Sequence, residues 1–465
     1  MEMTHKETIM LNGKVKPLIL KLSVPTIISM LITAIYNFAD TFFVSSVPSA
    51  RDAISAVGII FSFMAIIQAF GFFFGHGAGS FISRLLGQNK VEEAKTYAVV
   101  GFVGSFSFGL FITFLGLIFL DPLTRFLTAN KSLQVCTYAK DYLFWILIGA
   151  PFMASSNTMN NYLRYQGNAF QAMFGIGFGA ILNIFLDPFL IRHFSVYGAG
   201  LSTFISQTIS FMILLGCTNR KENIHFNLRY FKFSKEIIKN IFNGGFPSLA
   251  RQGLNAVSIA VLNLVTINYS IDSLAAMTVV NRIMSFAISI TLGIGQGFQP
   301  ICGICYGAKK FDRIKEGYIF TVILAVATLC VFLLVAILLG ENLIKVFATQ
   351  NAQFENYDEY IKIGKELLLY QSLAIPLYGF TTVTNITLQT IGKSVRATIL
   401  AIGRQALFFF PILFIFNKLW DFRGVELSQM VADICCFIVA VIMAWTLFKD
   451  LKKEVNTNID KSTQI

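Results

Sequence analysis

Charged residues are scarce in this sequence. Only 13% of the 465 residues are charged, whereas soluble domains are typically about 25% charged. Hydrophobic residues make up 55% of the chain, with 48 Phe and 34 Gly, and small residues let helices pack closely in lipid. This composition excludes the ordinary soluble classes, and it makes nucleic-acid binding a poor explanation of the net charge of +12. It indicates an integral membrane protein.

The sequence also lacks the short motifs of common nucleotide and metal sites. It has no G-x-x-x-x-G-K-[ST] phosphate loop and no H-E-x-x-H pair, and its four His are widely separated. The seven Cys follow no metal or disulfide spacing, and Cys302 and Cys305 lie in an apolar helical run. We therefore expect no enzyme activity, no cofactor and no metal site. Energy would come from an ion gradient or from the gradient of the substrate.

Long apolar runs are abundant instead. A membrane-spanning helix needs roughly 20 apolar residues, and the alternating segments of about ten residues that are typical of a membrane barrel do not occur. The first run follows a polar leader with no cleavage pattern, so we interpret it as a retained span. The sequence thus predicts an all-α membrane protein with twelve transmembrane helices, at residues 18–46, 53–82, 95–119, 136–160, 167–191, 196–217, 239–268, 275–305, 316–340, 363–389, 394–417 and 424–448.

Basic residues predict the orientation of these spans. The even-numbered loops and both tails hold most of the 37 Lys and Arg, so the positive-inside rule places both termini in the cytoplasm and the chain in the plasma (inner) membrane. The roles of three arginines inside spans, Arg251, Arg282 and Arg404, stay open. The largest basic cluster lies between the sixth and seventh spans and contains Arg220, Lys221, Arg229, Lys232, Lys235 and Lys239.

The second half of the chain repeats landmarks of the first half. Six spans per half make a parallel repeat, and such transporters hold substrate between their halves near the middle of the membrane. The sequence predicts two six-helix lobes related by a pseudo-two-fold axis, at residues 1–217 and 239–465, joined by a basic cytoplasmic linker at 218–238. The matching landmarks include the pairs Pro25 and Pro247, Asn160 and Asn385, and Gly167 and Gly392.

Two acidic residues stand out because a charged carboxylate at the bilayer centre costs about 2.5–3.5 kcal/mol. Asp40 lies well inside the first span, and Asp187 lies in the fifth span on the same helix face as Asn183, four residues earlier. Burial disfavours the charged form of a carboxyl group, so a proton gradient could load and unload these acids. At the repeat offset they correspond to Leu262 and Ile412, which argues against a purely structural role for them.

Several segments in order along residues 17–448 resemble the MATE (multidrug and toxic compound extrusion) family, closest to its DinF/MepA-like branch. The resemblance covers nearly the whole chain and implies the same two-lobe helical fold. The segments are Ser23-Val24-Pro25 through Tyr36-Asn37-Phe38-Ala39-Asp40-Thr41, Ser83-Arg84-Leu85-Leu86-Gly87, Ile304-Cys305-Tyr306-Gly307-Ala308, Asn183-x-x-x-Asp187-Pro188 and Gly198-Ala199-Gly200-Leu201-Ser202.

The resemblance implies a cation-coupling network in the first lobe. Sodium-associated, NorM-like relatives carry a Glu eight residues after the Pro of span seven, but this chain has Asn255 there. We therefore favour protons as the coupling ion, while Na⁺ at Asp40 and Asp187 remains an alternative because hard cations favour oxygen ligands. The coupling residues implied are Asp40, Asn183, Asp187, Thr203 and Tyr142, with Tyr36 and Asn37 one turn from Asp40.

The resemblance implies lipophilic cationic small molecules as substrates. Apolar and aromatic walls with flexible Met side chains suit such varied ligands, and ring faces attract cations. Candidates for the wall of a substrate cavity are Met153, Asn157, Asn255, Met284 and Gln296. The predicted function is export of such compounds by an ion-driven, alternating-access antiporter that acts as a monomer among membrane lipids and binds no nucleic acid.

Three other functions stay open. A lipid-linked saccharide flippase of the related MOP superfamily would need basic residues around its cavity to meet pyrophosphate. A carrier of the major facilitator type also has twelve spans, but its G-x-x-x-D-[RK]-x-G-[RK]-[RK] loop is only approximated by Gly307 to Lys315. A membrane enzyme or receptor lacks support from a catalytic cluster. Clustered Arg in the cavity would favour the flippase, and acids in the first lobe would favour cation export.

Overall fold

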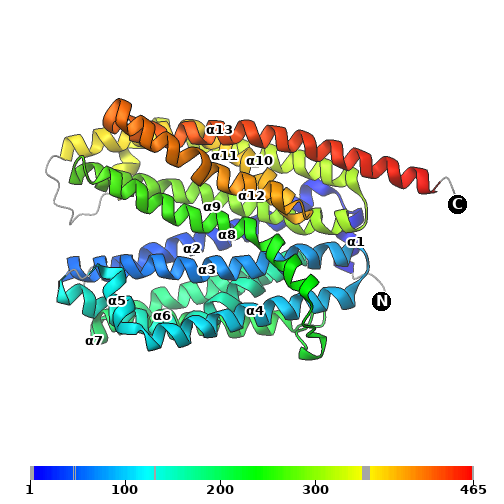
Figure 1. Cartoon of the computed structure of the whole chain (residues 1–465), viewed down its shortest axis with the longest axis horizontal. Helices are drawn as coiled ribbons and strands as arrows, with labels where there is room; N and C mark the ends of the chain where they lie inside the picture. The colour runs from blue at the N-terminus through cyan, green and yellow to red at the C-terminus, as the bar shows by residue number, and fades with distance from the viewer. Residues whose placement is uncertain (1–4, 45–46, 48, 130–131, 348–356, 463–465) are drawn as a thin grey trace.

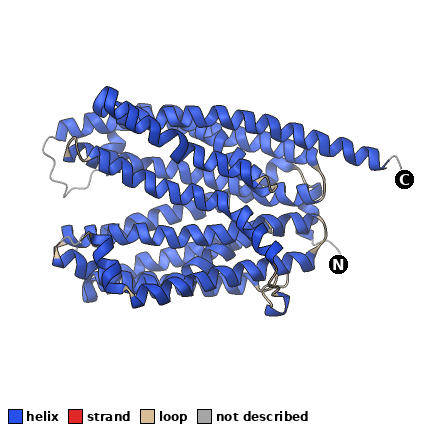
Figure 2. Cartoon of the chain, in the orientation of Figure 1, coloured by secondary structure: helices blue, strands red, loops and turns tan. Residues whose placement is uncertain are grey.

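The computed structural model describes residues 5–44, 47, 49–129, 132–347 and 357–462, excluding the side chains of residues 5, 37–41, 50–51, 271 and 455–462. The described residues form helices joined by short loops, with no strand among them (Figure 2). In the first half the helices are α1 (His5–Asn12), α2 (Val15–Val44), α3 (Ala50–Gly87), α4 (Val91–Ile118), α5 (Leu120–Thr128), α6 (Leu133–Tyr165) and α7 (Ala169–Thr218).

The second half begins after the 3₁₀ turn η1 (Leu228–Tyr230). Its π-helical segment η2 lies between two α-helices, and the long last helix continues past the final predicted span. The elements of this half are α8 (Lys235–Thr266), α9 (Ile271–Gly307), α10 (Phe311–Phe347), α11 (Tyr357–Thr390), α12 (Ser394–Ile402), η2 (Gly403–Phe408) and α13 (Phe409–Ser462).

The twelve predicted spans are confirmed, although two pairs of them share one continuous helix. Spans five and six form α7, which turns at Ser195, where φ is 56°. Spans eleven and twelve are α12, η2 and α13, which turns at Trp420 and Asp421. Gly198 and Gly424 follow these two turns, and at each glycine a Cβ would lie within 2.1 Å of a carbonyl oxygen before the turn. The tight turns therefore replace loops between antiparallel spans.

Hydropathy alone identifies seven spans among the described helices, and α6, α8 and α11 are not among them. These three helices carry polar residues that line a central cavity, such as Asn157 on α6, Arg251 on α8 and Asn385 on α11. Internal polar residues lower the mean hydropathy of a span without placing charge in lipid. Polar residues that line the cavity thus contribute to the lower hydropathy of these three spans.

The spans form two bundles, α2–α7 and α8–α13, which lie one above the other in Figure 1. Glycines allow the bundles to pack closely where α3 meets α8. A Cβ at Gly77 would lie 2.4 Å from the Ile241 carbonyl oxygen, and one at Gly245 would lie 2.2 Å from that of Phe73. We call this region, together with the contacts of Ser23 and Thr26 on α9, the closed end.

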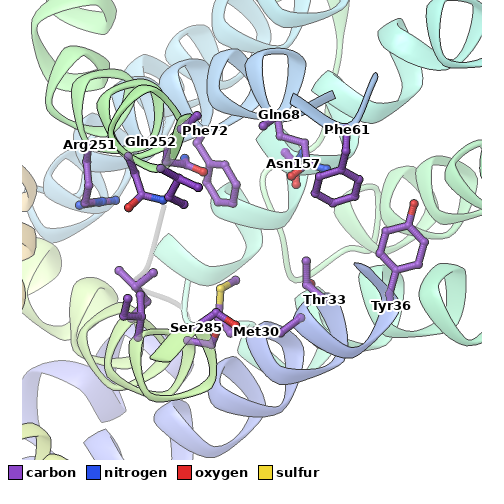
Figure 3. A pocket seen from close by; sticks show the side chains of 18 of the residues that line it. Met30, Thr33, Tyr36, Phe61, Gln68, Phe72, Asn157, Arg251, Gln252 and Ser285 are labelled. Carbon is purple, nitrogen blue, oxygen red and sulfur yellow. The ribbon is translucent and has the colours of Figure 1, made fainter. Parts of the chain in front are cut away.

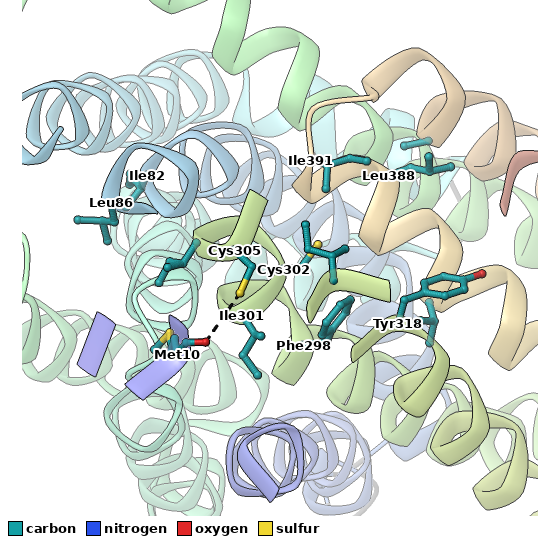
Figure 4. Packing of buried hydrophobic residues seen from close by; sticks show 14 of the residues in the cluster. Met10, Ile82, Leu86, Phe298, Ile301, Cys302, Cys305, Tyr318, Leu388 and Ile391 are labelled. Atoms are coloured by element: carbon teal, nitrogen blue, oxygen red, sulfur yellow. Dashed lines mark hydrogen bonds between the residues drawn. The ribbon is translucent and has the colours of Figure 1, made fainter. Parts of the chain in front are cut away.

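The short helix α1 covers the closed end and contacts both lobes. Met10 belongs to the apolar cluster that includes Ile301 and Cys305 of α9 (Figure 4). Arg313 Nη2 donates to the carbonyl oxygen of Met10 at 3.0 Å. Lys6 donates to Asn168 Oδ1 at 2.7 Å. Helix α1 therefore has partners in both lobes and bridges them. It lies in the polar leader, for which the sequence predicts no span.

Candidate functional site: a cavity between the lobes

A cavity of about 720 Å³ lies between the two lobes. Its volume falls in the range of ordinary small-molecule sites, roughly 300–1,000 Å³. Helices α2, α3, α6 and α7 supply one wall, and α8, α9, α11, α12 and η2 supply the other. The apolar and aromatic part of the wall includes Met153, Ile176, Ile259 and Tyr378. It also includes Met30, Tyr36, Phe61 and Phe72, which are labelled in Figure 3.

Asp187 lies in a buried polar cluster beside the first-lobe wall. Its side chain is completely buried, and Asn183 Nδ2 donates to Asp187 Oδ1 at 3.3 Å. The same amide donates to Ser202 Oγ at 3.0 Å, across the turn between the two halves of α7. Asn183 itself lines the cavity. The predicted pairing of Asn183 and Asp187 on one helix face therefore connects a buried carboxyl group to the cavity wall.

The other predicted coupling residues fall into three groups. Asp40 and Asn37 belong to α2, but their side chains lie outside the described residues. Tyr36 is buried and lines the cavity. Thr203 is 1% exposed and is next to Ser202 in the sequence. The hydroxyl of Tyr142 instead donates to the Met64 sulfur at 3.7 Å. Described hydrogen bonds therefore join Asn183 to Asp187 and to Ser202, a partner that the sequence did not identify.

Four of the five predicted cavity residues line the cavity: Met153, Asn157, Asn255 and Gln296. The exception, Met284, lies outside the cavity wall. It is buried in an apolar cluster of the second lobe, where its sulfur accepts a hydrogen bond from Ser372 at 3.9 Å. Met284 as a cavity residue stays a prediction, and an apolar span offers no sequence signal for which of its faces meets the cavity.

Asn255, which occupies the NorM Glu position, accepts a hydrogen bond from Gln405 Nε2 at 3.0 Å. Gln405 belongs to η2, and the Ser258 hydroxyl donates to its carbonyl oxygen at 3.2 Å. This part of the second-lobe wall is a neutral amide pair. Among the described side chains, no group of three or more His, Cys, Asp or Glu residues could hold a metal ion.

Arginine gives the second-lobe wall its charge. Arg251, Arg282 and Arg404 line the cavity, and no described acidic residue does so. Arg404 forms a bidentate ion pair with Asp433, with N–O distances of 2.6 and 3.3 Å. All three arginines lie inside predicted spans, and no local sequence pattern indicates that they face one cavity.

A second polar cluster crosses between the lobes behind the cavity wall. The fully buried Arg164 donates to Gln296, which lines the cavity, and to Asn161. Gln299 Nε2 donates to the hydroxyl of Tyr165 at 2.9 Å. Arg164 and Tyr165 come from α6, whereas both Gln residues come from α9. These contacts join the lobes near the closed end, and no local sequence pattern indicates such long-range pairing.

The MatE family model matches residues 25–189 and again residues 247–415. The chain belongs to the MatE family. The two matches fall on the two helical bundles, in agreement with the internal repeat predicted from the sequence. Family membership is consistent with a membrane protein that has two related helical bundles.

Individual relatives of this MatE-family chain are similar over almost their full length. The multidrug export protein MepA of Staphylococcus haemolyticus is 28% identical, over 91% of this chain and 92% of its own. A MATE crystal structure in complex with MaL6 has a TM-score of 0.90 at 26% identity, covering 97% of this chain and 100% of the other. An outward-facing multidrug resistance MATE family transporter of the MOP superfamily has a TM-score of 0.89 at 26% identity, with the same coverage.

Proposed function

We propose that this chain exports lipophilic organic cations in exchange for protons by alternating access. The observation that carries the proposal is the position of Asn183, which lines the inter-lobe cavity and donates to the buried carboxylate of Asp187. A change of charge at Asp187 would therefore reach the cavity wall through one hydrogen bond. The names of the relatives, a multidrug export protein and a multidrug resistance transporter, support the same assignment.

The aromatic and Met side chains of the wall suit a flat apolar cargo. Phe61 and Phe72 of α3 face Met30 of α2 across the cavity (Figure 3). Ring faces attract a delocalised cation, and thioether side chains adapt to different shapes. Binding would then depend on few fixed polar contacts, which allows more than one substrate.

The location of the closed end and of the basic 218–238 segment supports an outward-facing state. The lobes pack together at the closed end, where α1 and the segment after α7 are found. The basic residues of the 218–238 segment favour a cytoplasmic location by the positive-inside rule. With this orientation, both termini are cytoplasmic and the cavity is accessible from outside the cell. The chain works as a monomer in the plasma membrane, because the repeat supplies both walls.

Proton binding supplies the coupling. Protonation of Asp187, and of Asp40 in the same lobe, removes a negative charge from the membrane interior, where charge is costly. The hydrogen bond from Asn183 to Asp187 would weaken, and the cavity wall formed by α7 would rearrange and release the substrate. Exchange of one proton for one monovalent cation moves no net charge across the membrane, so the pH gradient drives it rather than the membrane potential.

Proteoliposomes with an imposed pH gradient test this proposal. Wild-type protein should accumulate rhodamine 123, a lipophilic cation, and Asp187→Asn should abolish the dependence of transport on pH because Asn cannot exchange a proton. Asp40→Asn should behave in the same way. The control is Asp141→Asn, which removes a partly buried acid of α6 that does not line the cavity and should leave the pH dependence intact. Wild-type rate and pH dependence in Asp187→Asn would overturn the proposal, and a response to Na⁺ alone would replace the proton with sodium.

The arginines of the second lobe favour one alternative, a flippase for lipid-linked saccharides. A pyrophosphate group carries several negative charges, however, and Arg404 is already neutralised by Asp433. Movement of a lipid-linked pyrophosphate across proteoliposomes, without transport of rhodamine 123, would support the flippase and exclude the drug antiporter.

A further inference from the structure

Arg251 places a guanidinium group in the cavity wall near the closed end. It lies on α8, six residues after Gly245, which packs against Phe73 of the other lobe. Figure 3 shows Arg251 and Gln252 reaching toward the cavity from α8, with Met30 and Ser285 across the open space. A charged side chain inside a membrane span is costly, and such residues usually serve a binding or transport role.

Neighbouring side chains hold this guanidinium in a fixed position. Arg251 Nη1 donates to Asn385 Oδ1 at 2.9 Å, and the amide of Asn385 is anchored in turn by a hydrogen bond to the carbonyl oxygen of Ala397 at 2.6 Å. Ser248 Oγ accepts from Arg251 Nη2 at 3.5 Å and from Gln389 Nε2 at 2.9 Å. A guanidinium has five N–H donors. The anchored acceptors orient the group and leave donors for a ligand.

No described carboxylate neutralises Arg251. Its two side-chain partners, Asn385 and Ser248, are both uncharged, and it forms no ion pair within the described part of the chain. A second guanidinium, that of Arg164, lies behind the wall and donates to the cavity-lining Gln296. Arg164 likewise has no described carboxylate partner. The closed end of the cavity therefore carries uncompensated positive charge.

The internal repeat shows that the scaffold does not need this charge. In the first lobe, Asn160 corresponds to Asn385 and makes the same anchoring bond, to the carbonyl oxygen of Ala172 at 2.8 Å. The residue that corresponds to Arg251, at the offset relating Pro25 to Pro247, is Ser29. Ser29 and Asn160 also line the cavity. The first lobe thus forms its part of the wall with the small hydroxyl group of Ser29, whereas the second lobe places the cationic Arg251 at the corresponding position.

We propose that Arg251 forms an anion-binding subsite that takes the carboxylate of a zwitterionic amphiphile. The planar guanidinium fork matches a carboxylate in a bidentate arrangement, while the aromatic and Met wall holds the apolar, cationic body of the same molecule. This inference rests on the proposed export function and narrows its substrate class. Arg404 is paired with Asp433, whereas the described partners of Arg251 are uncharged, so Arg251 can bind the carboxylate of a ligand.

Two dyes that differ at one group test the subsite. Rhodamine 110 carries a free carboxylate, and rhodamine 123 is its methyl ester, so their cationic ring systems are the same. Equilibrium binding to the purified full-length protein is measured by fluorescence polarisation. We expect Arg251→Gln to weaken rhodamine 110 binding about tenfold or more, because charge-assisted hydrogen bonds are lost, and to change rhodamine 123 binding less than about threefold. Arg251→Lys should fall between wild type and Arg251→Gln for rhodamine 110.

The control variant is Gln252→Ala, which removes a neutral cavity-lining side chain from the adjacent position of α8. It should change the affinity for both dyes by the same factor. Retained rhodamine 123 binding shows that Arg251→Gln is folded. Equal losses of both dyes in Arg251→Gln, or an unchanged affinity for rhodamine 110, overturn the subsite. If the wild-type protein still transports rhodamine 123, either of these results leaves the export proposal intact. If the wild-type protein binds neither dye, both the subsite proposal and the export proposal are wrong.

Discussion

Two arginines in the cavity wall differ in the partners that surround their guanidinium groups. Arg404 is neutralised by Asp433, which also accepts from Gln429 at 3.1 Å, and its guanidinium stacks 4.2 Å from the Tyr378 ring centroid. Arg251 is held only by neutral partners. Asp433 neutralises the charge of Arg404 within the lobe, whereas the charge of Arg251 remains available to a ligand in the cavity. Position inside a span therefore does not determine the role of an arginine; its partners do.

The Arg404–Asp433 pair should contribute to folding. Asp433→Asn leaves a largely buried guanidinium without its counter-charge, and breaking such a pair costs on the order of 3 kcal/mol. Unfolding in detergent micelles measures the loss. The matched control is Asp450→Asn on the same helix, which breaks the more exposed pair with Arg396 and should cost less than about 1 kcal/mol. Equal destabilisation by the two variants would contradict this assignment.

Local spacing was enough to predict part of the site. Asn183 and Asp187 are four residues apart on one helix, so their contact follows from the helical repeat. The contact of Arg251 with Asn385 joins residues separated by 134 positions, and no local pattern specifies it. Met284 lies in an apolar cluster of the second lobe, and an apolar span gives no periodic signal for the face that meets a cavity.

At the scale of helices, the close approach of α3 and α8 depends on glycine. The backbone of α8 at Gly245 rests against the Phe73 carbonyl group, with 2.2 Å to an added Cβ. Gly253, two turns further along the same helix, would have nothing within 4 Å of its Cβ. The two glycines therefore differ in packing while sharing one helix.

Gly245→Ala should weaken the closed end. The added methyl group must displace backbone, and overpacking of this kind costs about 1–3 kcal/mol. Hydrogen–deuterium exchange at the contacting segments of α3 and α8 should accelerate, and transport should slow because this closed state is less populated. Gly253→Ala is the control and should leave exchange at these segments unchanged. The same exchange in both variants would show that glycine packing does not hold the closed end together.

The helix α1 connects the lobes through polar and apolar contacts. Lys310 Nζ donates to Asn12 Oδ1 at 2.8 Å, and Lys6 pairs with Glu222 after α7 at 2.6 Å. The hydrogen bond from Lys6 lowers the pKa of Glu222 below its ordinary value. The contribution of this contact to folding stability is therefore fully present at pH values above the ordinary carboxyl pKa of about 4.3. It is lost as the pH falls through the lowered pKa of Glu222.

Deletion of residues 2–12 should expose the thiol of Cys305. Cys305 is completely buried and its Sγ donates to the Met10 carbonyl oxygen at 3.8 Å (Figure 4). Maleimide labelling of the shortened chain should be faster than labelling of the full chain. Cys305→Ser in the shortened chain identifies the labelled site by removing the extra signal. An unchanged labelling rate would mean that other elements cover this thiol.

Long apolar runs made the helices predictable, and chain reversals were harder. Each span needs about 20 apolar residues, a signal strong enough to survive the polar side chains of α6, α8 and α11. The turns at Ser195 and Asp421 have positive φ values of 56° and 49°, and they join spans that the sequence analysis separated. The short helices α1 and α5 were not predicted, because they are too short to produce a spanning run.

At the scale of the whole molecule, the lobes must separate at the closed end for the cavity to reach the other side of the membrane. Helices α3 and α8 supply a direct test. A Cβ at Gly244 would lie 3.2 Å from Ser80 Oγ, and the two residues belong to opposite lobes. Replacing both by Cys places a sulfur and a Cβ at a spacing that suits a disulfide.

Oxidation of the Ser80→Cys, Gly244→Cys double variant should stop transport of rhodamine 123, and reduction should restore it. A covalent link at the closed end prevents the lobes from parting, so the cavity cannot change its access. Each single variant, treated with the same oxidant, controls for the seven native Cys. Continued transport by a fully cross-linked protein would exclude alternating access through separation at this end.

The matched bonds of Asn160 and Asn385 have a consequence for how a transport cycle distributes its motion. Each bond fastens two consecutive spans of its own lobe around a glycine turn, at Gly167 with φ 79° and at Gly392 with φ 87°. Each bond therefore holds the junction of its two spans fixed while the lobe tilts. The rearrangement of α7 on protonation would then be confined to the part of the helix beyond this junction, where Asn183 and Asp187 lie.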